Sequence, residues 1–105
     1  MSTIKYQKLV RDRIPEIIRD SGKRCEYTIL SDDDYIQMLD AKLSEELAEY
    51  LESKSMEELA DLLEVIRAIA KARGSSIDAV EAIRRDKAVK RGAFDQKILL
   101  HEVED

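Results

Sequence analysis

Carboxylates are concentrated between residues 45 and 64, and two pairs of them have helical spacing. Glu46 and Glu49 form the first pair, and Glu58 and Asp61 form the second. Residues three apart are neighbours on a helix surface, where like charges cost a few tenths of a kcal/mol. Helical geometry puts Glu46 nearest the apolar stripe of its helix and Glu58 inside the apolar arc of the next. A carboxylate at such a buried edge costs free energy or must take up a proton, unless a cation compensates its charge.

The two pairs belong to neighbouring helices that are joined by a short connection. Such a connection favours an antiparallel hairpin, which brings the four carboxylates together. An oxygen-only site of this kind suits Mg²⁺ or Mn²⁺, which accept phosphate oxygens in their remaining positions. The alternative is that these glutamates are solvated on helix surfaces. For Glu58 the alternative is specific, because it is the fourth residue of an S-x-x-E capping box that starts at Ser55.

The elements that must position these residues are mostly helices. Periodicity, serine caps and glycine stops predict helices from Pro15 to before Gly22 and over residues 31–52, 55–74 and 75–91. Alternation over residues 24–30 and a strand-like segment at 97–103 predict a small pair of strands. We therefore expect an all-α fold of about four helices in an antiparallel bundle, with a minor two-stranded β element.

Size and charge restrict the class of protein. A chain of 105 residues is predicted to be one domain, residues 1–105. Its formal net charge of −5 argues against a nonspecific nucleic-acid or membrane-surface protein, and no apolar window reaches the roughly 18 residues of a membrane span. We expect a cytoplasmic protein. Small helical domains with broad apolar faces often associate, so we expect a homodimer or higher homo-oligomer.

Basic side chains offer phosphate ligands in two places. Lys87 and Arg91 lie four apart on one face of the last helix, in a basic stretch that either binds phosphate or complements the helix dipole. Lys42 lies within the acidic region, where it either contacts phosphate or pairs with Glu46.

Several motifs together carry a family resemblance. They are E-E-x-x-E at 45–49, E-x-x-D at 58–61, YQKLVRDRIP at 6–15, ELADLLEVIRA at 58–68, and Lys87 with RGAF at 91–94. This set resembles the MazG-like, all-α nucleoside triphosphate pyrophosphohydrolases, a superfamily that includes the phosphoribosyl-ATP pyrophosphohydrolases. Within it, the chain is similar to a small subgroup of predicted house-cleaning enzymes.

The resemblance implies a Mg²⁺-dependent cleavage of a nucleoside triphosphate between its α and β phosphates. The implied metal ligands are Glu46, Glu49, Glu58 and Asp61, in agreement with the face argument. Glu45 is then either a supporting carboxylate or the general base.

Lys42, Lys87 and Arg91 are the expected contacts to the substrate. Lys8, Arg11 and Asp12 belong to the resemblance, but the residues alone assign them no role.

Two other functions remain open. One is phosphoribosyl-ATP hydrolysis, and the other is a non-catalytic helical dimerisation module whose acids are solvated. A P-loop NTPase is excluded because the chain has no G-x-x-x-x-G-K-[ST] motif.

Overall fold

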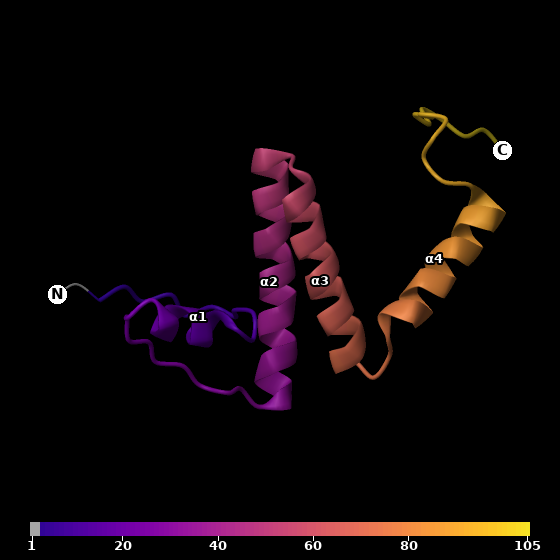
Figure 1. Cartoon of the computed structure of the whole chain (residues 1–105). Helices are drawn as coiled ribbons and strands as arrows, with labels where there is room; N and C mark the ends of the chain where they lie inside the picture. Colours follow the sequence, from indigo (N-terminus) through magenta and orange to yellow (C-terminus); the bar gives the residue numbers. More distant parts are fainter. Residues whose placement is uncertain (1–2) are drawn as a thin grey trace.

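Four helices make up the regular structure of the chain (Figure 1). The computed structural model describes residues 3–105, and no strand occurs within that range. The helices are α1 (Ile14–Asp20), α2 (Asp32–Ser53), α3 (Met56–Ala72) and α4 (Ile77–Arg91). The all-α expectation is therefore confirmed, with each helix ending within two residues of its predicted boundary.

Serine residues cap the three long helices at their N-termini. The hydroxyl oxygens of Ser31, Ser55 and Ser76 accept hydrogen bonds from the backbone N–H three residues later, at 3.3, 3.3 and 3.1 Å. Each bond satisfies one of the N–H groups that a helix leaves unpaired in its first turn. The sequence signals for these starts are thus confirmed in atomic detail.

Helices α2 and α3 form an antiparallel hairpin and lie side by side (Figure 1). Lys54 turns the chain between them with a left-handed φ of 59°. The buried apolar residues are Leu39 on α2 and Val65 and Ala70 on α3. This hairpin holds the small core of the chain, and it also carries both acidic pairs.

The other two helices leave the hairpin partly uncovered. Among residues 3–105, α4 contacts α3 but has no backbone contact with α2, and in Figure 1 it leads away from the hairpin. The expected four-helix bundle is consequently not closed by a single chain. Large apolar side chains stay exposed on both α3 and α4, including Leu63 and Val89.

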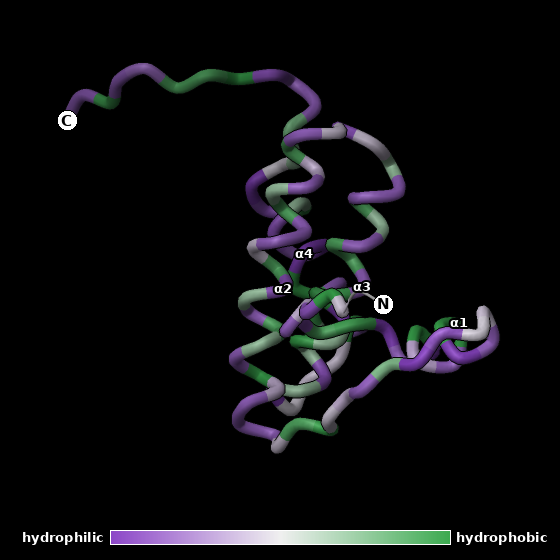
Figure 2. Tube along the Cα trace, turned by 90° about the vertical axis from the view of Figure 1, so that its left-hand side faces the viewer, coloured by the Kyte–Doolittle hydropathy of each residue, from purple (hydrophilic) through white to green (hydrophobic). Residues whose placement is uncertain are grey.

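The expected two-stranded element does not form within the described chain. Residues 24–30 and 97–103 have no secondary structure, and they lie on opposite sides of the hairpin (Figure 1). A strand needs a neighbour for its ladder hydrogen bonds, and neither segment has one in this arrangement. In Figure 2 the apolar residues of the second segment follow a tail that extends away from the helices.

Within the described residues, none of α1 to α4 combines the length and the apolar character needed to cross a bilayer.

Candidate metal centre

The acidic pairs meet between α2 and α3. One group of three carboxylates, from Glu46, Glu58 and Asp61, brings one oxygen of each within 4.8 Å of the others. A second group, from Glu45, Glu46 and Glu49, satisfies the same limit. Glu46 belongs to both groups and so lies at the centre of the cluster.

Glu46 is buried although it carries an ionisable group. Its residue exposure is 7%, and its Oε2 atom has no hydrogen-bond partner within residues 3–105. Burial raises the pKa of its carboxyl above 4.5, and the neighbouring Glu49 carboxylate raises it further. An unpartnered carboxylate oxygen in such a place costs free energy unless a cation or a proton is supplied.

Glu58 does not complete the capping box that its sequence position suggests. The N–H of Ser55 donates to the Ser53 hydroxyl at 3.3 Å, whereas a full capping box would direct it to the Glu58 carboxylate. Oε2 of Glu58 is instead a second buried oxygen without a partner in the described chain. The side chain of Glu58 is therefore available to the acidic cluster.

Lys42 lies inside the cluster and pairs with two of its members. Its Nζ is 3.3 Å from Glu45 Oε1 and 3.4 Å from Glu46 Oε1. Burial alone would lower the pKa of Lys42, but the hydrogen bonds and charges of the two glutamates outweigh it and raise that pKa. The expected pairing with Glu46 is thus present, and Lys42 keeps its positive charge at the site.

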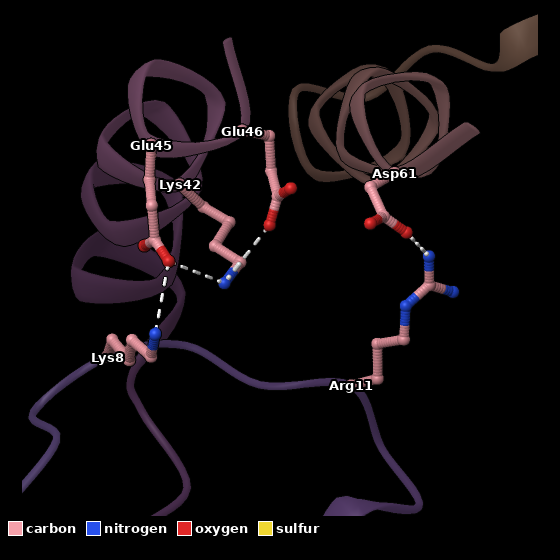
Figure 3. A network of polar contacts seen from close by, with 6 residues as sticks. All are labelled: Lys8, Arg11, Lys42, Glu45, Glu46 and Asp61. Carbon is pink, nitrogen blue, oxygen red and sulfur yellow. Dashed lines mark hydrogen bonds and ion pairs between the residues drawn. The ribbon is translucent and has the colours of Figure 1, made fainter. Parts of the chain in front are cut away.

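Glu45 approaches the cluster more closely than its helical direction suggests. Its carboxylate accepts hydrogen bonds from Lys42 and, at 3.2 Å, from Lys8 (Figure 3). Burial acts to raise the pKa of Glu45, yet these two bonds prevail and lower it. Attraction to two cations explains why the side chain bends towards the site.

The N-terminal segment supplies two cations that the residue types alone left without a role. Lys8 pairs with Glu45 on α2, and the Arg11 guanidinium donates to Asp61 Oδ1 on α3 at 2.8 Å (Figure 3). The partners are 37 and 50 residues apart in the chain. The KLVRD motif marked these residues, but only the folded chain pairs them with the acids.

The predicted phosphate ligands on α4 are not part of the acidic cluster in the single chain. Lys87 and Arg91 are on the helix that has no backbone contact with α2, and both are exposed. Their neighbours Arg84 and Lys90 pair with acids of α4 itself, Glu81 and Asp86. Their role as substrate contacts therefore remains a prediction.

The donor set fits a hard divalent cation. All candidate ligands are carboxylate oxygens, which Mg²⁺ and Mn²⁺ prefer over nitrogen or sulfur. The buried, unpartnered oxygens of Glu46 and Glu58 are the positions that such an ion would satisfy. Of the four predicted ligands, Glu46, Glu58 and Asp61 lie in one group, whereas Glu49 lies with Glu45 and Glu46 in the other. Their role as metal ligands remains a prediction.

Comparison with known proteins adds a partial relative. An uncharacterized protein of Mycolicibacterium smegmatis is 62% identical over 42 residues, which cover 40% of this chain and 43% of that protein. The match therefore spans less than half the length of the curated relative. No family model matches the chain. No solved structure matches it either.

Proposed function

We propose that this chain is a Mg²⁺- or Mn²⁺-dependent nucleoside triphosphate pyrophosphohydrolase. The observation that carries the proposal is the buried Glu46 carboxylate, whose unpartnered oxygen lies in a cluster with Glu58 and Asp61. Lys42 pairs with one oxygen of this carboxylate, but the other oxygen is buried without a partner in residues 3–105, and such an atom opposes folding. Its presence is explained by a cation that binds there during function.

The proposed reaction adds water across the anhydride between the α and β phosphates of the substrate. It yields a nucleoside monophosphate and pyrophosphate, as the sequence motifs imply. Glu46, Glu49, Glu58 and Asp61 would hold the metal. When bound, the ion would supply positive charge that offsets the charge of the phosphate oxygens.

The chain's own residues divide the remaining tasks. The hydrogen bonds from Lys8 and Lys42 keep Glu45 ionised, so it can orient a water molecule or accept its proton. Lys42 is charged and adjacent to the cluster, where it can contact a phosphate oxygen once the acids are neutralised.

The direct test is pyrophosphate release from a panel of normal and modified nucleoside triphosphates. We expect release by the wild type with Mg²⁺ or Mn²⁺, and loss of release in Glu58→Gln. Glu64→Gln is the matched control, because Glu64 lies on the same helix but is exposed outside the cluster. An active Glu58→Gln variant would contradict the assignment.

The same panel separates the rival functions. Release from phosphoribosyl-ATP alone would favour an enzyme of that specificity. A non-catalytic dimerisation module predicts no release, no stabilisation by Mg²⁺, and unchanged or improved stability in Glu58→Gln. A metal site instead predicts that Mg²⁺ raises the melting temperature of the wild type by mass action, and not that of the variant.

We also propose that two or more copies associate. Support comes from the exposed apolar residues that a single chain leaves uncovered, including Leu63 on α3 and Ile83 and Val89 on α4. Large apolar side chains that stay exposed in a single chain are often covered at interfaces. In such an assembly, Lys87 and Arg91 of one copy could approach the acidic cluster of another copy. Sedimentation at several concentrations tests it, and a monomer throughout would contradict it.

A further inference from the structure

The N-terminal segment crosses the acidic cluster and contacts both helices of the hairpin (Figure 3). Lys8 reaches α2 and Arg11 reaches α3. Three residues of extended chain span roughly 10 Å, which matches the 8–10 Å between the axes of packed helices. The distance along the chain between Lys8 and Arg11 therefore allows one of them to contact α2 and the other to contact α3.

Both cations are paired with acids of the candidate metal centre itself. Arg11 is the partner of Asp61, and Lys8 shares Glu45 with Lys42. The centre also holds the buried Glu46 side chain, which is 9% exposed and has an unpartnered oxygen. Asp61 would no longer attract Arg11 as strongly if it held a divalent ion, and the guanidinium donors of Arg11 would then be free to bind an anion.

A cavity lies beside Lys8, the cation that pairs with Glu45. Its volume is about 160 Å³, and it lies between residues 7–9 and the turns of α2 that carry Met38, Lys42 and Glu45. Ligand pockets for whole small molecules usually measure about 300–1,000 Å³. This smaller cavity, with Lys8 and Lys42 in its wall, suits a phosphate group.

We propose that Lys8 and Arg11 bind the phosphate groups of the substrate. Without a metal ion they serve as counter-ions of the acidic cluster. With one, they face the polyanion, for which arginine and lysine are the usual protein ligands. The inference rests on the proposed function, because it assigns the phosphate contacts of that same site.

The probes are Mg²⁺ alone and inorganic pyrophosphate with Mg²⁺, measured by titration calorimetry. For Arg11→Gln we expect pyrophosphate to bind about ten-fold more weakly, as for a lost charged hydrogen bond. Mg²⁺ alone should bind as well or up to about five-fold more tightly, because a competing exposed ion pair is gone. Lys8→Gln should show the same pattern to a smaller extent, since Lys42 still pairs with Glu45.

Two further variants keep the test specific. Arg11→Lys keeps the charge and should retain most of the pyrophosphate affinity. Arg13→Gln is the matched control, because Arg13 is on the same segment and pairs only with Glu16 at 3.1 Å in the described chain. It should leave both affinities unchanged.

Unchanged pyrophosphate affinity in both Arg11→Gln and Lys8→Gln would overturn the inference. A loss of Mg²⁺ affinity that parallels the loss of pyrophosphate affinity would also overturn it. Lys8 and Arg11 would then only position the carboxylates of the cluster. These two results can be distinguished from a failure of the proposed function. In that case the wild type itself would release no pyrophosphate from any nucleoside triphosphate.

Discussion

The α2–α3 hairpin and helix α4 are both rich in charge, yet the two regions use it differently. In the hairpin, Glu46 is buried, and burial raises the pKa of its carboxyl. On α4, Glu81 is only half-buried, and a hydrogen bond from Arg84 lowers the pKa of its carboxyl. A glutamate near a basic residue on a helix is thus an ordinary surface pair or a costly buried group, depending on what packs against it.

The difference teaches where to look for function in a highly charged chain. The ion pairs of α4 lie in solvent, where such pairs contribute little to stability. Those of the hairpin lie around carboxylate oxygens that have no hydrogen-bond partner in residues 3–105. The following four experiments test this contrast, from the largest expected effect to the smallest.

The first experiment compares the cores of the two regions. Leu39→Ala on α2 should lower the free energy of unfolding by about 2–5 kcal/mol, because the side chain is 3% exposed and leaves a cavity. Val89→Ala on α4 should change it by no more than about 0.5 kcal/mol, because Val89 is 82% exposed. Urea denaturation of dilute protein measures both. Equal losses would mean that α4 is packed in solution.

The second experiment compares the acids by activity. Glu46→Gln should lower pyrophosphate release about 100-fold or more, because it removes the central carboxylate of the cluster. Glu81→Gln should leave release unchanged, because its partners Arg84 and Arg85 are on α4 itself. Steady-state rates with saturating Mg²⁺ provide the measurement. An equal fall in the rate of pyrophosphate release in the two variants would mean that α4 belongs to the active site.

The third experiment compares two helix caps. Ser55→Ala and Ser76→Ala each remove one hydroxyl cap, a loss of about 1 kcal/mol in helix stability. The first should also reduce stabilisation by Mg²⁺, because the capped N–H belongs to Glu58. The second should only accelerate amide exchange in α4. Mass-spectrometric hydrogen exchange with and without Mg²⁺ measures both, and an equal response to Mg²⁺ would refute the distinction.

The fourth experiment uses pH and compares each variant with the wild type in the absence of metal. The folded pKa of Glu46 is raised above 4.5, so its contribution to stability is complete below the unfolded pKa and is lost as pH rises through the folded pKa. The wild type should therefore lose stability relative to Glu46→Gln as the pH rises above about 4.5.

The pH dependence of the stability contribution of Glu81 has the opposite sign. Its folded pKa lies below 4.5, so its contribution is present above the unfolded pKa and is lost as pH falls through the folded pKa. The wild type should lose stability relative to Glu81→Gln as the pH falls below about 4. Unfolding free energies from urea titrations at each pH give the slopes. Two slopes of the same sign would remove the contrast.

Much of the site was predictable because helical periodicity is local. The spacing of Glu46, Glu49, Glu58 and Asp61, together with a short connection, predicted four acids facing one another across a hairpin, and the structure brings Glu46 together with Glu58 and Asp61. The expected strands were wrong for this chain for the converse reason. Alternation over residues 24–30 and 97–103 indicates a preference for extended, strand-like backbone. A strand forms only beside a partner strand, however, and the fold of the described residues brings none next to either segment.

By itself, the sequence determined the helices, their serine caps and the faces on which the acids lie, since each follows from residues within a few positions of one another. Only the tertiary structure decided that Glu46 and Glu58 keep unpartnered buried oxygens and that Lys8 and Arg11 cross to α2 and α3. The physical reason is distance along the chain. Contacts across 37 and 50 residues depend on how the segments pack, which no local spacing specifies.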